Sequence, residues 1–273
     1  MSEEKISLSN QAVTNVPGPG EAGFVPPAAA VPLPSRGAIY PVGHPLHGKE
    51  ILEIRAMTAR DEDILTSRAL VKSGRVIDVL LKACMVDKSI DVDSMLFGDR
   101  NAALVAIRIT GYGQEYAVEV ECPACGNKFK HEFNLSVLPV KRLGADPREL
   151  GKNEFVFTLP VSRKEVLFKL LNGTDERELS TTLEATRKAS GGAESLVTTR
   201  LQHQILAIGN ESDKGKLAMI IRNLPARDSR DLRKYMNSIA PDVLMTQDTK
   251  CPSCTEVSSL EVPMGTEFFW PAT

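Results

Sequence analysis

Apolar and polar residues alternate where the folded part of the chain begins. The segment ILEIRAM, which starts at Ile51, has the period of two that a half-buried strand requires. Thr58 follows directly, with Asp61 three positions later, a spacing close to the capping box that begins many helices. The pattern therefore predicts a strand that leads into a helix.

Helical periodicity continues from this point. The first helix is predicted to break at Gly74, and the next segment, VIDVLLKACMV, carries one apolar stripe in which Cys84 is a core residue. A further helix is predicted over about 99–110, and Gly111 is placed to end it. Residues 37–113 are thus expected to form a strand plus a helical N-terminal part.

Strand alternation returns on both sides of a Cys-Pro-Ala-Cys-Gly turn in QEYAVEVECPACGNKFKHEFNLS, and NEFVFTLP is a further strand. A second turn of this kind, Cys-Pro-Ser-Cys, lies in KCPSCTEVSSLEVPM. These patterns predict two β-hairpins, each with a metal knuckle at its tip. Residues 114–160 and 245–273 are therefore expected to form one zinc-ribbon-like β element assembled from distant segments.

Between the two hairpins the period is helical again. Helices are predicted over 174–189, 194–208 and 226–239, so residues 161–244 are expected to be a helical insert. The fold class that follows is α+β: a helical N-terminal part, hairpins brought together from distant segments, and a helical insert between them. The insert is expected to project from the ribbon as a closed lobe.

The first 36 residues have a different composition, rich in Pro, Ala and Gly, as in VTNVPGPGEAGFVPPAAAVPLPSRG. Closely spaced prolines remove backbone donors and favour polyproline conformations. Residues 1–36 are therefore expected to be an extended N-terminal arm without helix or sheet. Such a segment either stays mobile or docks along a neighbour.

Two CxxC pairs contain most of the cysteines. Cys122 with Cys125 and Cys251 with Cys254 supply four thiolates, the ligand set that tetrahedral zinc takes in structural sites. Because such a sphere leaves no open position, the ion is expected to be structural rather than catalytic. The pairs lie far apart in the chain, so a shared zinc ion would staple the two hairpins together.

Three other interpretations of these cysteines remain open. Each pair could be a separate redox motif, the four residues could be unconnected, or an iron–sulfur cluster could take the same four thiolates. A redox CxxC opens a helix after a strand, whereas both pairs here lie between strand-like runs. This context favours zinc.

Composition narrows the choice of partners. The chain of 273 residues has 33 basic and 35 acidic residues, and its net charge is -2. No overall field draws such a protein onto nucleic acid or an anionic membrane, and no membrane insertion is expected. No stretch approaches the roughly 18 apolar residues of a membrane span, and the polar start MSEEKISLSN is unlike a signal peptide. We therefore expect synthesis in a reducing cytoplasm without export by that route.

Catalytic chemistry is not indicated by the sequence. His44 and His47 form an HxxH that could hold a metal ion, but no carboxylate or cysteine lies beside them, which favours packing. His131 could hydrogen-bond near the first knuckle or lie on an exposed face, and His203 is expected to be solvated. No HExxH, GxSxG, P-loop or GxGxxG pattern is present. A non-enzymatic protein without a small-molecule substrate is predicted.

The segment ARDSRDLRKY is the basic run that could contact nucleic acid. Its cations are Arg227, Arg230, Arg233 and Lys234, and its interleaved acids are Asp228 and Asp231. A phosphate-binding helix would present a face without acids. A solvated or protein-facing helix is therefore predicted.

Three features, in this order, resemble one family. The segment EIRAMTARDEDIL, the CPACG hairpin, and CPSC followed by FFWP are similar to the baseplate proteins of T4-type contractile bacteriophages, over most of residues 45–271. The resemblance implies a subunit of the hub or inner baseplate of the virion tail, made in the host cytoplasm. It implies binding to other tail and baseplate proteins, a second copy of this chain among the candidates.

Two alternatives to this role stay open at the level of sequence. The first is a hub assembly chaperone that leaves before the particle matures. The second, from another class, is a zinc-ribbon nucleic-acid-binding protein.

The aromatic end of the chain follows the second knuckle. Phe268, Phe269, Trp270 and Pro271 could cover the ribbon core or anchor in the pocket of a partner. Their position directly after the knuckle favours a lid on the core.

Overall fold

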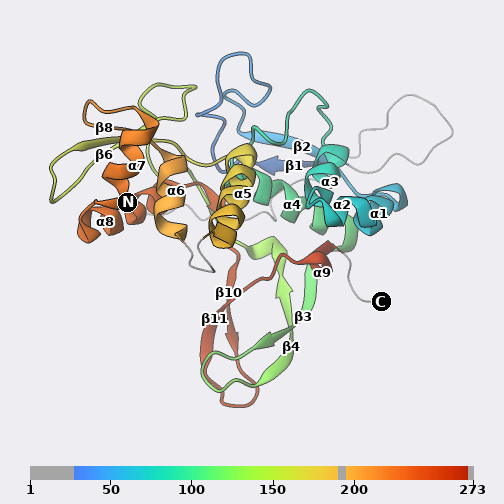
Figure 1. Ribbon diagram of the computed structural model, residues 1–273. Coiled ribbons are helices and arrows are strands. Elements are labelled where there is room, and N and C mark those ends of the chain that lie inside the picture. The colour runs from blue at the N-terminus through green and yellow to red at the C-terminus, as the bar shows by residue number, and fades with distance from the viewer. Residues whose placement is uncertain (1–27, 190–194, 270–273) are drawn as a thin grey trace.

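The computed structural model describes residues 28–189 and 195–269, which form a body and an arm (Figure 1). The body contains helices packed with small antiparallel sheets, and the arm consists of two hairpins that extend from it. The chain therefore has a mixed architecture of helices and antiparallel strands, as expected for an α+β protein.

Strand β1 (Ala28–Pro32) pairs antiparallel with β2 (Ile51–Arg55). Ala29 and Val31 of β1 are buried, and Pro32 lies at the end of the ladder, where a proline is tolerated. The expectation that the N-terminal arm makes no sheet is therefore wrong from Ala28 onward, because alternate small residues there bury one face. Residues 1–27 lie outside the described residues.

Helices follow β2 in the order α1 (Ala59–Thr66), α2 (Arg68–Lys72), α3 (Val76–Cys84) and α4 (Phe97–Tyr112). Thr58 and Asp61 form the capping box at the start of α1. Helix α4 runs through the middle of the body, and most of its residues are buried. It ends at Gly113, with φ of +85°, rather than at Gly111, because only the later glycine adopts the left-handed backbone.

A three-stranded sheet accompanies the helices of the insert. Its strands β7 (Glu165–Phe168) and β8 (Ile205–Ile208) pair side by side, and β6 (Phe155–Thr158), from the range expected for the ribbon, pairs with β7 instead. The helices of the insert are α5 (Gly173–Ala189), α6 (Leu196–Gln204), α7 (Lys214–Arg222) and α8 (Ala226–Ile239). Two further expectations are corrected. The helix predicted over 194–208 ends at Gln204, because the apolar run ILAI forms β8 beside β7. Helix α7 was not predicted.

The insert packs into the same core as the N-terminal part. Strand β5 (Val140–Lys141) pairs with β9 (Asp242–Val243), and α4 packs against β9. Gly98 of α4 lies so close to the insert that an added Cβ would be 1.9 Å from the Pro241 carbonyl oxygen. One continuous set of buried apolar residues links both parts. The insert is therefore no separate lobe, and it is the ribbon that projects (Figure 1).

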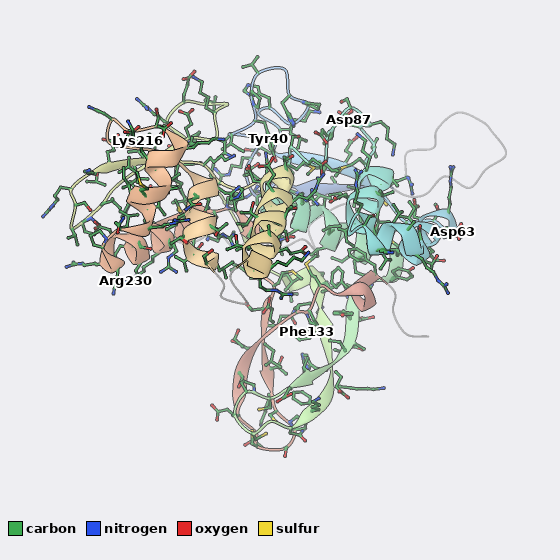
Figure 2. All side chains as sticks on the ribbon, viewed as in Figure 1. Tyr40, Asp63, Asp87, Phe133, Lys216 and Arg230 are labelled. Atoms are coloured by element: carbon green, nitrogen blue, oxygen red, sulfur yellow. The ribbon has the colours of Figure 1, made fainter. Side chains whose placement is uncertain are left out.

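The arm is made of β3 (Glu115–Glu121) with β4 (Lys128–Asn134), and β10 (Thr246–Lys250) with β11 (Val257–Glu261). Each hairpin is its own two-stranded antiparallel sheet. In β3 and β4 the apolar side chains alternate with charged ones, and Tyr116 and Phe133, at the base of the arm, are fully buried. Phe133 is labelled at the root of the arm in Figure 2.

Candidate metal centre

The two turns at the tip of the arm have equivalent hydrogen bonds. In the first, Cys122 N donates to Asn127 O at 2.9 Å and Gly126 N donates to Cys122 O at 2.8 Å. In the second, Cys251 N donates to Glu256 O at 2.9 Å and Thr255 N donates to Cys251 O at 3.0 Å. Each CxxC pair is thus held in the same tight turn, with both sulfurs facing the other hairpin.

The four sulfur atoms lie together. Cys122 Sγ is 3.7 Å from Cys254 Sγ, and Cys125 Sγ is 3.8 Å from Cys251 Sγ. All four lie within 4.8 Å of one another. Sulfurs bound tetrahedrally at about 2.3 Å from a zinc ion are separated by about 3.8 Å. The cluster therefore has the size and donor set of a four-thiolate zinc site.

The local electrostatics differ among the four thiols. The Glu256 amide lowers the pKa of Cys254, but hydrogen bonds with the neighbouring cysteine sulfurs raise it to about 12. Backbone amides of Cys254 and Ser253 donate to the Cys251 sulfur and lower the pKa of its thiol to about 7, against the opposing effect of burial. Cys122 and Cys251 are buried, while Cys125 and Cys254 are exposed. Because metal ligands must be deprotonated, amide donors of this kind prepare a site for a cation.

Between tip and base, the two hairpins carry both apolar and polar contacts. Half-buried apolar side chains of the first hairpin pack against the core cluster here: Val118, Val120 and Phe129. The Thr249 hydroxyl lies 3.1 Å from His131 Nε2, and the Asn134 backbone N–H donates to Gln247 Oε1 at 3.3 Å. His131 therefore lies between the hairpins and is not part of the cysteine cluster.

The base of the arm is closed by aromatic residues. Phe268 and Phe269, in α9 (Thr266–Phe269), are buried, and the Phe268 ring meets the Tyr116 ring edge-on at 5.2 Å. The preference for a lid over an anchor is confirmed for these two residues. Trp270 and Pro271 lie outside the described residues.

The remaining histidines do not form a second metal site. His44 Nε2 contacts the Ser94 hydroxyl at 2.9 Å and its Nδ1 accepts from Leu46 N, while His47 Nδ1 contacts Tyr40 O at 2.6 Å. These rings pack within the body. In the described part of the chain, the four cysteines are the group of metal-binding side chains that the geometry brings together.

The basic run lies on α8 and is partly neutralised. Asp228 is fully buried and accepts from the amides of Val161 and Ser162, so it fixes the turn between β6 and β7. Asp231 pairs with Arg230 at 2.9 Å, and Arg230 is labelled on the outer side of the body in Figure 2. The exposed side of the helix therefore mixes acidic and basic side chains.

Two buried polar residues were not singled out from the sequence. Asp99 is fully buried and accepts from Ser35 N at 2.9 Å and from the Tyr40 hydroxyl at 2.6 Å. Arg108 lies between the rings of Tyr112 and Tyr116 at the root of the arm. Their partners are distant in sequence or aromatic, so no local motif marks them.

The comparison with protein families identifies the class of this chain. Residues 39–270 match the family described as T4 bacteriophage base plate protein, and the chain therefore belongs to that family. Neither the curated proteins nor the solved structures contain a match. Within the described residues, no helix has the length and apolar character needed to cross a membrane.

Proposed function

We propose that this protein is a structural subunit of the hub or inner baseplate of a contractile tail and acts through protein–protein contacts. The observation that carries the proposal is the family match over most of the chain, residues 39–270. The shape supports it, because a rigid body with a projecting arm offers several separate surfaces to neighbouring subunits (Figure 1). Its location is then the baseplate of the virion tail.

The arm is proposed to be locked by one structural zinc ion held by Cys122, Cys125, Cys251 and Cys254. The spacing of the sulfurs, at 3.7 and 3.8 Å for the two close pairs, supports a single ion. It argues against an iron–sulfur cluster, whose several metal atoms would need a wider ring of ligands. Metal analysis of the purified protein should find one zinc per chain, and iron with absorption in the visible range would contradict this assignment.

A role without catalysis is proposed on the same grounds. Four thiolates fill the coordination sphere of zinc, so no position is left for water or substrate. The histidines of the body are held by packing contacts, as described above. The proposal is that binding of other tail proteins is the whole activity.

The decisive experiment is quantitative mass spectrometry of purified tailed particles. The number of copies of this chain is measured against the tube and sheath subunits. A fixed copy number that matches the symmetry of the baseplate is the expected result. Absence from mature particles, with abundance in lysates of infected cells, would replace the subunit by an assembly chaperone that leaves during maturation.

Nucleic-acid binding is tested separately by retention on heparin at low salt. The net charge of -2 and the acids interleaved on α8 lead us to expect no retention. Tight binding that weakens steeply with salt would favour the nucleic-acid-binding alternative. Gel filtration of the same sample would reveal whether the chain associates with itself.

A further inference from the structure

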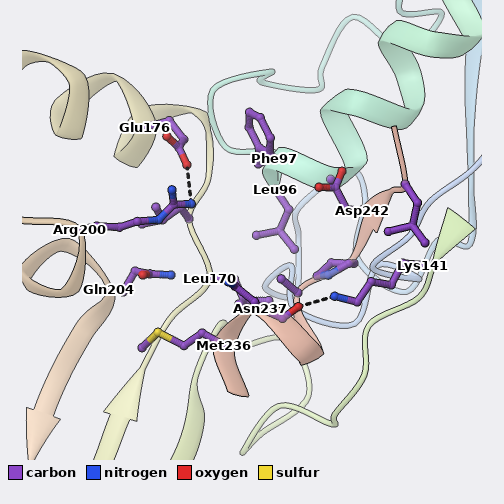
Figure 3. Close-up of a pocket in the computed structure, with 15 residues that line it drawn as sticks. Leu96, Phe97, Lys141, Leu170, Glu176, Arg200, Gln204, Met236, Asn237 and Asp242 are labelled. Carbon is purple, nitrogen blue, oxygen red and sulfur yellow. Dashed lines mark hydrogen bonds and ion pairs between the residues drawn. The ribbon is translucent and has the colours of Figure 1, made fainter. Parts of the chain in front are cut away.

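A pocket of about 290 Å³ lies where the N-terminal part meets the insert (Figure 3). Its floor is apolar and buried, with Leu96 at the start of α4, Leu170 after β7 and Met236 of α8. Two large apolar side chains on its rim are exposed to solvent, Phe97 by 47% and Leu244 by 43%. A pocket of this size, with apolar residues on its floor and rim, suits one large side chain of a partner.

The Gln204 side chain presents to this pocket an amide without a protein partner among the described residues. Gln204 is only 8% exposed, and it is the last residue of α6. Figure 3 shows its amide group directed toward the middle of the pocket. Within the part of the chain that the structure describes, this amide makes no hydrogen bond to protein, and it is not one of the fully buried unpaired polar groups, so its donors and acceptor are open to a ligand in the pocket. One donor and one acceptor at this depth match a peptide unit.

The pocket is lined by two bases and two acids, and Lys141 is the base that makes no direct ion pair in the described part of the chain. Arg200 pairs with Glu176 at 3.5 Å, and Asp242 already accepts from Asn101 at 2.9 Å and from its neighbouring amide. Lys141 donates to the Asn237 carbonyl and lies opposite Asp242 in the β5–β9 ladder, without a direct ion pair among the described residues. Burial lowers the pKa of Lys141, and the charge of Asp242 offsets this only in part. A partner carboxylate in direct contact would stabilise the charged lysine further.

We propose that this pocket binds an extended segment of a neighbouring baseplate protein that carries one large apolar side chain next to an Asp or Glu. The apolar side chain enters between Phe97 and Leu244, its peptide unit bonds to Gln204, and the carboxylate pairs with Lys141. The proposal rests on the function proposed above, because it takes the partner from the assembled tail.

The test uses the full chain in infected cells, with the photo-crosslinking residue p-benzoylphenylalanine placed singly at Phe97, Leu244 or Val42. Val42 is 85% exposed and lies outside the pocket, so it serves as the control position. Crosslinked peptides are identified by mass spectrometry. Positions 97 and 244 are expected to link to the same segment of another tail protein, with an apolar residue beside an acid, and position 42 is not.

Substitution Gln204→Leu separates a binding role from a structural one. Because the amide has no protein partner within the described residues and faces the open pocket, its replacement at constant volume should leave the thermal midpoint of the free protein unchanged or higher. The crosslinking yield at position 244 should fall on the order of fivefold, as expected for a lost hydrogen bond. A lower midpoint with an unchanged yield would show that Gln204 supports the fold and would overturn the proposal.

The remaining outcomes are also decisive. The proposed partner would be overturned if the crosslinking yield at positions 97 and 244 were no higher than at Val42. It would also be overturned if these positions linked only to a second copy of this chain or to nucleic acid. The copy number in particles is read from the same samples. A chain present in particles without pocket-specific links would refute the pocket alone, whereas absence from particles and their precursors would refute the baseplate function itself.

Discussion

Thr255 and Gly126 occupy equivalent positions after the two CxxC pairs, and both have left-handed backbones. Their φ angles are +63° and +71°. A side chain in this conformation costs roughly 1 kcal/mol, which glycine avoids. The substitution Thr255→Gly is therefore expected to raise the free energy of unfolding of the arm by about 1 kcal/mol, measured by denaturant unfolding of the metal-loaded protein.

The reciprocal substitution Gly126→Thr is the matched control. It should lower stability by a similar amount, since the same penalty is introduced in the other turn. Equal free energies of unfolding for both variants and the unmodified protein would contradict this prediction. They would show that the positive φ angle costs nothing at either position.

Asp61 gives the protein a defined response to acid. Its carboxylate accepts hydrogen bonds from Arg55 at 2.6 and 2.9 Å and from Thr58 N at 2.8 Å. The bonds to Arg55, together with those to Thr58, lower the pKa of Asp61 to about 2. Because the folded pKa lies below the unfolded value near 4, the stabilisation is complete above about pH 4 and is lost as pH falls toward 2.

Substitution Asp61→Asn should therefore lower the free energy of unfolding at pH 7 by about 2 kcal/mol. The difference from the unmodified protein should shrink toward pH 2, where the carboxyl is protonated in both states. Urea titrations at several pH values measure it. A difference that stays constant with pH would mean that the carboxylate contributes shape rather than charge.

At the scale of elements, removal of the metal should loosen the arm and spare the body. The outer part of β3 and β4 contributes half-buried apolar side chains such as Val118, Val120 and Phe129, whereas most of the fully buried core lies in the body. The variant Cys122→Ser, or chelation, is expected to abolish hydrogen-exchange protection in β3, β4, β10 and β11 while α4 stays protected. The measurement is exchange followed by mass spectrometry, segment by segment.

Cys84→Ser is the control for this experiment, because Cys84 is a buried core residue far from the tip. It should retain the metal and the protection of the arm. Loss of protection throughout the body on chelation would contradict the independence of the core from the ion.

The sequence predicted the elements whose signals are local. The hairpins, the capping box at Thr58 and helix α8 follow from alternation, spacing and a clear apolar stripe. Strand β8 was mistaken for the end of a helix, since four apolar residues suit either state until β7 lies beside them. β1 was missed because its prolines outweighed the buried positions of Ala29 and Val31.

The functional sites also divide into those with a local sequence signal and those that depend on packing between distant segments. The four cysteines are marked by two CxxC spacings, so the sequence could name them before the structure brought their sulfurs together. No local motif predicts the pocket-facing amide of Gln204 or the packing of α4 against β9. Both exist only through contacts between segments far apart in the chain, which periodicity does not report.

At the scale of the whole molecule, the contact of Gly98 with Pro241 joins the N-terminal part to the insert. A Cβ at this position would lie 1.9 Å from the Pro241 carbonyl oxygen, so backbone would have to move. The substitution Gly98→Ala is expected to lower the free energy of unfolding by about 3 kcal/mol through overpacking. Calorimetry would measure the lower midpoint.

Gly111→Ala in the same helix is the matched control. Its Cβ would meet only the Met57 side chain at 3.5 Å, an ordinary contact. Since alanine is the better helix former, this variant should be neutral or up to about 1 kcal/mol more stable. Equal losses in both variants would mean that glycine in α4 matters for the helix and not for the joint.

The position of the sulfur cluster at the far end of the arm has a mechanical consequence. With an ion bound, the four strands are joined at the tip by metal–sulfur bonds and at the base by the body, so the arm is a closed frame. A sideways load on its tip is then shared by both hairpins and bends them together, whereas two unlinked hairpins would slide past each other. In the contractile tail proposed above, such a frame would carry force between neighbouring subunits without unfolding.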